Sequence, residues 1–148
     1  MLNPTSPLPL QDPTLFRQAN CIDGKWVQAD SGRTIVVKNP ATGEAIGEVP
    51  ALGAAETRRA IEAAHRAQPA WRALLAKERA AILRKLNDLM LANTEDLAVI
   101  MTAEQGKPLS ESKGEIAYAA SFIEWFAEEG KRIYGDTIPQ NHSMKLAA

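Results

Sequence analysis

The chain has 148 residues and a formal net charge of −1, and 45% of its residues are hydrophobic while 24% are charged. This composition is that of an ordinary folded domain, and without an excess of basic residues to neutralise phosphates we expect no nucleic-acid binding. No apolar run is long enough to cross a membrane, and a single cysteine excludes an intrachain disulfide. Since no signal-peptide or presequence pattern is present at the N-terminus either, we expect a cytoplasmic protein.

The first fifty residues predict a loose arm followed by two β-hairpins. Four prolines in residues 1–13 fix φ and remove amide donors, which indicates a flexible arm. Residues 22–27 carry an Asp-Gly pair between two short strand-like runs, the pattern of a two-residue hairpin turn. The β-branched residues 34–38 and the run 45–49 predict a second pair of strands, joined by an Asn-Pro-Ala-Thr-Gly-Glu turn.

The rest of the chain predicts four alanine-rich helices. Apolar residues recur at helical spacing over 54–67, 76–92, the stretch between Asn93 and Gly106, and 110–134. We expect Pro69 to end the first helix, Asn93 to cap the third and Gly106 to follow the last turn of the third. The predicted fold class is therefore α/β, with two short β-hairpins followed by about four α-helices.

No set of side chains forms a recognisable catalytic group. Cys21 lies in a predicted strand, away from any helix N-terminus that would activate its thiol, and is interpreted as a small, buried, apolar residue. His65 and His142 are far apart and have no second ligand nearby, so we expect neither to bind a metal. The acidic pairs Glu95-Asp96 and Glu128-Glu129 are interpreted as solvated helix faces.

Aromatic residues mark one face of the last predicted helix. Tyr118, Phe122 and Phe126 recur at every fourth position and so share a face. Two interpretations stay open: an aromatic seam in the core, or one wall of a ligand channel. Lys107, beside the helix-ending Gly106, is interpreted as a lysine that interacts with a helix dipole.

The order and spacing of several short motifs resemble the N-terminal third of the NAD(P)-dependent aldehyde dehydrogenases. The motifs are Asn39–Glu44 after a β-branched strand, Ala60–Ala64 with Trp71, Glu78–Arg79 with Leu83, and Glu104–Pro108. Within that family, Phe122–Pro139 is similar to the succinate-semialdehyde dehydrogenases of the GABA degradation route. The resemblance covers residues 16–139 and implies an N-terminal fragment of such an enzyme.

The resemblance implies an enzyme that oxidises an aldehyde, succinate semialdehyde above all, to the acid with NADP or NAD. In the family a cysteine thiolate attacks the aldehyde, hydride passes to the nicotinamide, and a glutamate activates the water that cleaves the thioester. These groups come later in the family than the part that this chain resembles, and Cys21 does not occupy the position of the nucleophile. We therefore expect no catalytic and no cofactor-binding residue here, no tight cofactor binding, and no activity of the chain alone.

Two further sites are implied by the same resemblance. Several relatives hold a structural monovalent cation, whose ligands correspond here to the main-chain carbonyls of Val37 and Lys38 and the side chain of Glu104. Oxygen ligands suit such a hard cation. One face of the last helix borders the substrate entrance in relatives, which makes Tyr118 and Phe122 the candidate substrate-channel residues.

The resemblance also implies domains and partners. Residues 1–13 would be a flexible arm, 14–139 the N-terminal part of the cofactor-binding domain, and 140–148 the start of a strand used in oligomerisation. The expected partners are a small aldehyde and further copies of the enzyme, with neither nucleic acid nor membrane. Because alanine-rich helices that lack their usual packing surface expose apolar faces, we expect the fragment to self-associate. The alternative function is a non-enzymatic helical module that docks onto a full-length dehydrogenase or another protein.

Overall fold

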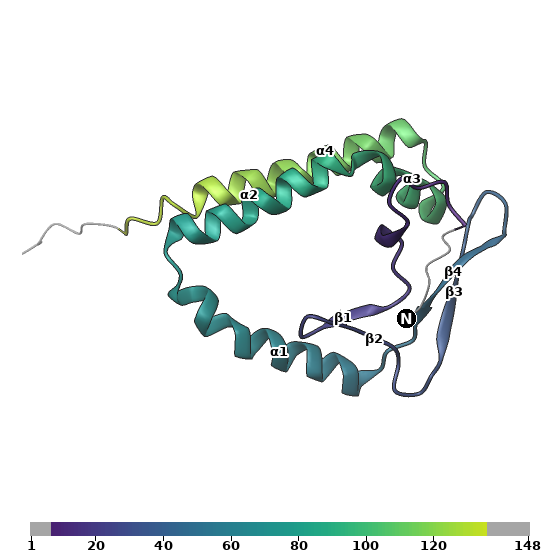
Figure 1. Cartoon of the computed structure of the whole chain (residues 1–148), viewed down its shortest axis with the longest axis horizontal. Helices are drawn as coiled ribbons and strands as arrows, with labels where there is room; N and C mark the ends of the chain where they lie inside the picture. Colours follow the sequence, from purple (N-terminus) through teal and green to yellow (C-terminus); the bar gives the residue numbers. More distant parts are fainter. Residues whose placement is uncertain (1–6, 136–148) are drawn as a thin grey trace, which may run out of the picture.

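The described part of the chain, residues 7–135 of a computed structural model, contains two small antiparallel hairpins and four α-helices (Figure 1). In chain order the elements are a 3-10 turn at Pro13–Leu15, β1 Asn20–Ile22, β2 Lys25–Val27, β3 Thr34–Lys38, β4 Ala45–Pro50, α1 Ala54–Ala73, α2 Ala76–Ala92, α3 Thr94–Gln105 and α4 Leu109–Glu129. This order confirms the expected α/β arrangement of two hairpins followed by four helices.

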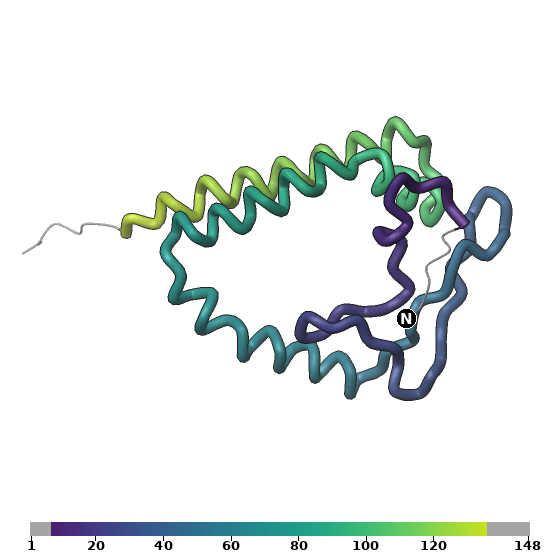
Figure 2. Tube along the Cα trace, in the orientation of Figure 1, coloured from purple at the N-terminus to yellow at the C-terminus, as the bar shows by residue number. Residues whose placement is uncertain are grey.

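The helices form an open arrangement rather than concentric layers (Figure 2). α2 and α4 lie side by side and run antiparallel, and α3 packs against α4 at one end of the pair. α1 runs along the opposite side and makes its main contact with β1. Among residues 7–135, none of these helices combines the length and the apolar character needed to span a membrane.

Glycine is required at specific points of both hairpins. The β1–β2 hairpin turns through Asp23 and Gly24, whose φ angles are 53° and 70°, which confirms the predicted Asp-Gly turn. In β4, a Cβ added at Gly47 would lie 2.8 Å from the ring of Phe16. The absence of a side chain at Gly47 therefore lets the segment before β1 cover β4.

α1 continues past Pro69 to Ala73, so the expectation that Pro69 ends this helix is wrong. Proline removes the amide that would donate to the carbonyl of His65, four residues earlier, and its ring crowds that carbonyl. Both residues are exposed, so water can donate to that carbonyl in place of the missing amide. The helix is thereby weakened locally without being interrupted.

A buried carboxylate fixes the start of α1. Glu56 is 5% exposed and accepts hydrogen bonds from the main-chain amides of Gly53 and Asp30, each at 3.0 Å. The first bond is the one that the glutamate of a capping box makes, and the second ties α1 to the loop after β2. The carboxylate of Asp30 in turn binds the guanidinium of Arg59 through two contacts of 2.7 Å.

Small side chains occupy the contact between α2 and α4. Ala80 of α2 and Ala120 and Ala127 of α4 are buried, which lets the two backbones approach closely. The side-chain amide of Asn87 donates to the main-chain carbonyl oxygen of Ala120 at 2.8 Å. A buried hydrogen bond thus crosses a contact beside which these three alanines are buried.

α3 departs from the prediction at its beginning and follows it at its end. Asn93 precedes the helix, but its side chain donates to the carbonyl oxygen of Leu89 in α2, at 2.8 Å, instead of capping α3. Gly106 follows the last turn with a φ of 79°, as predicted. A Cβ at Gly106 would lie 2.7 Å from Cγ of Pro40, so glycine lets the end of α3 touch the β3–β4 turn.

α4 ends at Glu129, earlier than the predicted residue 134. Gly130 follows, and glycine is a poor helix former because it loses much backbone freedom on ordering. After it, the side chains of Lys131 and Arg132 turn back to pair with Glu128 and Glu129. These ion pairs cover the end of the helix.

The proline-rich arm is attached to α3 through Asp96. The main-chain amides of Gln11 and Asp12 donate to the two carboxylate oxygens of Asp96, at 2.9 and 2.7 Å. Asp96 is 5% exposed, so its interpretation as part of a solvated helix face is wrong. Its neighbour Glu95 is exposed and pairs with Lys113 at 2.7 Å. The flexibility expected of the arm as a whole stays a prediction, and residues 1–6 lie outside the described range.

Candidate functional site

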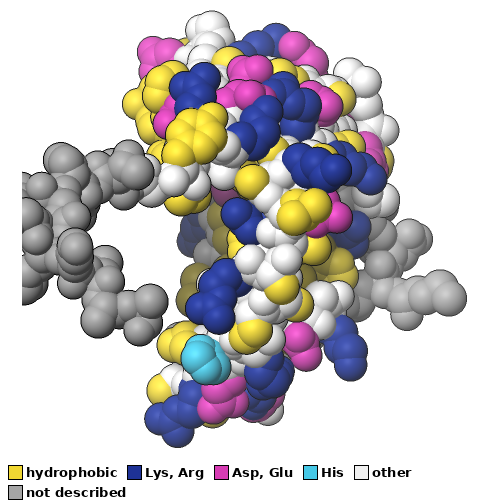
Figure 3. All heavy atoms as spheres, turned by 90° about the vertical axis from the view of Figure 1, so that its left-hand side faces the viewer, with side chains coloured by type: hydrophobic (Ala, Val, Ile, Leu, Met, Phe, Trp, Pro, Cys, Tyr) yellow, Lys and Arg dark blue, Asp and Glu magenta, His cyan; other side chains and the backbone are white. Residues whose placement is uncertain are grey.

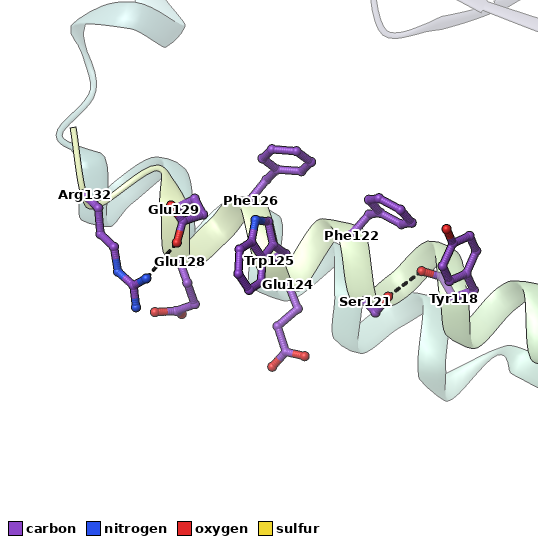
Figure 4. A pocket seen from close by; sticks show the side chains of 9 residues that line it. All are labelled: Tyr118, Ser121, Phe122, Glu124, Trp125, Phe126, Glu128, Glu129 and Arg132. Carbon is purple, nitrogen blue, oxygen red and sulfur yellow. Dashed lines mark hydrogen bonds and ion pairs between the residues drawn. The ribbon is translucent and has the colours of Figure 1, made fainter.

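The aromatic side chains of α4 form an open groove on the surface of the molecule (Figure 4). The volume of this groove is about 660 Å³. The residues that line it all belong to α4 and the turn after it: Tyr118, Ser121, Phe122, Glu124, Trp125, Phe126, Glu128, Glu129 and Arg132. The recurrence of aromatic residues at every third or fourth position places them together along the helix.

The aromatic side chains are exposed rather than buried. The exposed fractions are 66% for Tyr118, 46% for Phe122 and 59% for Phe126. The interpretation as an aromatic seam in the core is therefore wrong for residues 7–135. The other interpretation, one wall of a ligand channel, requires accessible rings, and for Tyr118 and Phe122 it stays a prediction.

Tyr118 and Phe122 hold one another in a defined orientation. Their ring centroids are 4.8 Å apart and their planes meet at 84°, the edge-to-face geometry that aromatic pairs favour. Between them along the helix, the hydroxyl of Ser121 donates to the carbonyl oxygen of Tyr118 at 2.7 Å. The groove therefore presents an ordered apolar surface against which methylene groups can pack.

Charged side chains border the groove on one side of α4. Glu128 pairs with Lys131 at 2.6 Å and with Arg84 of α2, and Arg84 also lies 3.6 Å from Glu124. The bond from Lys131, followed by that from Arg84, holds the pKa of Glu128 below its ordinary value of 4.5. These contacts leave Glu128 half-buried, whereas the sequence placed it on a solvated helix face. This side of the groove is acidic, with its neighbouring cations already paired.

Sequence reasoning did not assign Trp125 to the groove. Trp125 is 61% exposed and lies among the lining residues beside Phe122 and Phe126 (Figure 4). The available signal was its spacing of seven residues from Tyr118, which corresponds to two helical turns. The predicted pattern followed only the spacing of four and so missed it.

The structure places the two parts of the implied cation site in elements that contact one another. Val37 and Lys38 lie at the end of β3, Glu104 lies in the last turn of α3, and α3 packs against β3. Carbonyl and carboxylate oxygens suit a hard cation, but these three groups supply only part of a coordination shell. In residues 7–135, no three His, Cys, Asp or Glu side chains are grouped so as to hold a metal. The cation site at Val37, Lys38 and Glu104 stays a prediction.

The remaining reactive residues lie apart from the groove. Cys21 is a free thiol in β1 and is exposed, so the expectation that it is buried is wrong. It faces a row of small residues in α1, among them Ala60 and Ala64. His65 is exposed on α1, and His142 lies outside the described residues.

A family comparison gives the affiliation of the chain. The sequence pattern of the Aldehyde dehydrogenase family matches residues 26–148. The chain belongs to the aldehyde dehydrogenase family. The resemblance carried by the motifs around Asn39 and Glu104 is thereby confirmed.

Individual relatives of this aldehyde dehydrogenase chain are longer proteins. It is 70% identical over 136 residues to the glutarate-semialdehyde dehydrogenase of Pseudomonas aeruginosa. The aligned residues make up 92% of this chain and 28% of that protein. It is 63% identical over 136 residues, with the same coverage, to the succinate-semialdehyde dehydrogenase [NADP(+)] of Escherichia coli. A crystal structure of an NADP-dependent enzyme of Escherichia coli superposes with a TM-score of 0.89, over 90% of this chain and 28% of that one. The chain thus spans 28% of the length of the relatives and adopts the fold of their N-terminal segment.

Proposed function

We propose that the chain forms the N-terminal part of an NAD(P)-dependent dehydrogenase that oxidises a semialdehyde to the corresponding dicarboxylate. The observation that carries this proposal is the identity of 70% and 63%, over 92% of the chain, with enzymes named for glutarate and succinate semialdehyde. Succinate semialdehyde is the proposed substrate and glutarate semialdehyde its nearest alternative. The name of the Escherichia coli relative supports NADP as the nucleotide, with NAD as the alternative.

The contribution of this chain to the site is one apolar wall of the substrate channel. Tyr118 and Phe122 are exposed, ordered by their edge-to-face contact, and part of one groove. Ligand sites are usually lined by such apolar and aromatic side chains, with a few polar groups that set the orientation. The methylene groups of a short semialdehyde would pack against the two rings, which keep water away from that side of the substrate.

The charges around the groove support one orientation of the substrate. Arg132, the cation among the lining residues, is paired with Glu129 at 2.7 Å. On the other flank, Glu124 and Glu128 would repel a carboxylate. The carboxylate end of the semialdehyde therefore points away from α4, toward cationic groups supplied by the rest of the enzyme.

On this proposal, the residues that carry out the redox step belong to the remaining polypeptide of the enzyme. When bound, the nicotinamide accepts the hydride, and we place its binding site beyond the residues described here. The chain then serves as the first part of a cofactor-binding domain over 14–139, with 140–148 leading into a strand used for oligomerisation. On this proposal the chain alone binds neither nucleotide tightly and oxidises no aldehyde.

The first test uses the purified chain. Incubation with succinate semialdehyde and NADP, or with NAD, is expected to give no increase in absorbance at 340 nm. NADPH formation that depends on the chain and on a thiol would overturn this part of the proposal.

The second test joins the chain to the remaining part of the Escherichia coli relative. This chimera is expected to oxidise succinate semialdehyde, and Tyr118→Ala and Phe122→Ala to raise the KM for the aldehyde several-fold while leaving the KM for NADP unchanged. Ile35→Ala, an exposed apolar position on β3, serves as the control. If the aldehyde KM is unchanged in both α4 variants, the channel assignment is wrong.

A further inference from the structure

The outer edge of β3 is unpaired within residues 7–135. The amide of Ala51 donates to the carbonyl oxygen of Arg33 at 2.9 Å, so these two residues form a hydrogen-bonded pair at the end of the β3–β4 ladder. In an antiparallel ladder such pairs alternate with pairs whose main-chain groups point outward, and Val36 with Glu48 is a pair of this second kind. The N–H and C=O groups of Val36, and by the same alternation those of Thr34, therefore point away from β4.

The free edge of β3 is also regular. The partner positions along β4 skip Ile46 between those of Val37 and Lys38, so the extra residue of the bulge belongs to β4. β3 itself continues without interruption from Thr34 to Lys38. A regular edge of outward donors and acceptors is a template on which another strand can pair.

The edge of β4, by contrast, is covered by residues that precede β2. The side chain of Gln18 accepts a hydrogen bond from the outward amide of Glu48 at 2.8 Å. The side-chain amide of Asn20 donates to the outward carbonyl oxygen of Pro50 at 3.5 Å. Of the two edges of this hairpin, the edge of β3 is therefore the one that can accept another strand.

The sequence of β3 is complementary to itself in the antiparallel direction. When two copies of Thr34–Lys38 are centred on Val36, this residue lies opposite its own counterpart and Ile35 lies opposite Val37. The outward N–H of each Val36 then meets the outward C=O of the other copy. Ile35 and Val36 are 58% and 48% exposed, so both would lose apolar surface to water on pairing. β-branched residues opposite one another favour such a strand pair.

The charged residue at the end of the edge fits the same pairing. Thr34 would lie opposite Lys38 of the second copy, and the hydroxyl of Thr34 donates to the carboxylate of Glu48 at 2.7 Å. The ammonium group of Lys38 thus approaches a carboxylate. A parallel pairing in register would instead place the two copies of Lys38 side by side, which is destabilising. The charges therefore favour the antiparallel arrangement.

The end of the molecule far from the β3–β4 hairpin has a different character. Around the turn from α1 into α2, apolar side chains are interspersed with basic and acidic ones (Figure 3). A mixed surface of this kind favours solvation over association. A contact between copies is therefore better served by the β3–β4 hairpin, which lies at the opposite end (Figure 1).

We propose that two copies of this chain associate through the edges of β3 and form one antiparallel sheet with the strand order β4–β3–β3–β4. The contact is isologous, and because both outer edges are the covered edges of β4, it closes at two copies instead of growing into a fibre. A pair of such short strands buries less than the about 800 Å² per partner of a stable interface, so the dimer is weak and depends on concentration. The proposal is independent of the proposed function.

Sedimentation equilibrium of the whole chain tests the contact. We expect wild type to change from monomer to dimer as its concentration rises. Val36→Pro removes the outward amide but spares the β3–β4 ladder, because proline is tolerated on an edge where the N–H faces away from the sheet. It should weaken dimerisation roughly tenfold or more. Val36→Thr keeps both the amide and the β-branched shape, and should dimerise as wild type does.

Disulfide formation tests the register. Cys21 is the only cysteine of the chain, so Cys21→Ser gives a background without thiols. In the proposed dimer the two Cα atoms of residue 36 form a hydrogen-bonded pair about 5.5 Å apart, which a disulfide can span. Val36→Cys should therefore cross-link under mild oxidation at concentrations where the dimer forms. Ile35→Cys is the matched control, because its two copies would lie on a diagonal of about 7–8 Å and should cross-link far more slowly.

The two experiments leave the proposal open to contradiction even if Val36→Pro unfolds the hairpin, because the cross-linking uses no proline. Selective cross-linking of Val36→Cys, with loss of the dimer in folded Val36→Pro, supports the contact. A chain that stays monomeric at its highest soluble concentration overturns it, and so does equal cross-linking of the two cysteine variants. A dimer that survives Val36→Pro but dissociates in Phe122→Lys would place the contact on α4 and would also overturn the proposal.

Discussion

Asn87 in α2 donates a hydrogen bond from its side-chain amide to the main-chain carbonyl oxygen of Ala120 in α4, over 2.8 Å. The side chain of Asn87 is 6% exposed, so water cannot replace this acceptor. The carbonyl of Ala120 lies within α4 and can also accept its intrahelical hydrogen bond. Loss of the bond between the two residues therefore costs the buried amide of Asn87 more than it costs this carbonyl. This asymmetry fixes where α2 lies along α4.

We expect Asn87→Ala to lower the free energy of unfolding by about 1–3 kcal/mol, because it removes a buried hydrogen bond and leaves space in the helix contact. Urea denaturation followed by circular dichroism measures the change. Asp88→Ala, at the exposed neighbouring position, should stay within about 0.5 kcal/mol of wild type. Equal losses in the two variants would show that the bond to Ala120 has no special role.

Asp96 is the residue on which the attachment of the arm depends. Asp96→Asn keeps one oxygen acceptor and places an amide donor opposite a main-chain amide, so one of the bonds from Gln11 and Asp12 is lost and replaced by a donor–donor contact. We expect the free energy of unfolding to fall by about 2 kcal/mol and proteolytic cleavage near residue 11 to become faster. Mass spectrometry of timed digests locates the cut. Glu95→Gln, which alters only an exposed ion pair, should leave the cleavage rate unchanged, and a similar increase there would contradict the assignment.

Glu56 predicts how stability depends on pH. The main-chain amides of Glu56 itself, Asp30 and Gly53 hold the pKa of Glu56 below its ordinary value of 4.5. The ionised side chain therefore contributes stability that is fully present above about pH 4.5 and is lost as the pH falls through the folded-state pKa. The bond to Arg59 also lowers the pKa of Asp30. Protonation of Asp30 at low pH therefore removes stability as well.

Glu56→Gln should be less stable than wild type near neutral pH, and the difference should shrink on acidification as the two curves converge. Denaturant midpoints between about pH 7 and pH 3 test this expectation. Ala55→Gln places the same amide at an exposed neighbouring position. Its denaturant midpoint should change with pH as much as that of wild type does. A constant gap between Glu56→Gln and wild type would mean that the carboxylate charge is not what stabilises the start of α1.

Local sequence patterns were enough to predict the elements but not the contacts that join them. The Asp-Gly turn at Asp23 and the glycine at Gly106 were predictable because a positive φ leaves few alternatives to glycine and asparagine-like residues. The bond from Gly53 to Glu56 has a weaker local signal, because glycine has no side chain that would complete the Ser/Thr-x-x-Glu signature of a capping box. Asp96, by contrast, binds amides that are 84 and 85 residues away in the sequence. No periodicity within α3 distinguishes such a residue from a solvated acid.

The candidate site was predicted in part for a related reason. The spacing of Tyr118, Phe122 and Phe126 established that they share a face, which the structure confirms. Whether that face is buried depends on what covers α4, and the same pattern serves a core seam and a channel wall equally well. The pairing of Arg84 with Glu128 was equally inaccessible, because it joins two helices whose packing is set by tertiary structure.

Pro69 offers a test of how α1 is stabilised along its length. The first half of α1 is anchored by Glu56 and by β1, whereas the turns around Pro69 are exposed and lack one intrahelical bond. Pro69→Ala restores the donor to the carbonyl of His65 but also gives the unfolded chain more conformational freedom. We expect a net increase of about 1–2 kcal/mol in the free energy of unfolding. The gain should be local, since few tertiary contacts couple this segment to the rest of the molecule. Slower amide hydrogen exchange in residues 69–73, with Gln68→Ala as the exposed control, is the expected result. Unchanged exchange would mean that the proline does not weaken the helix.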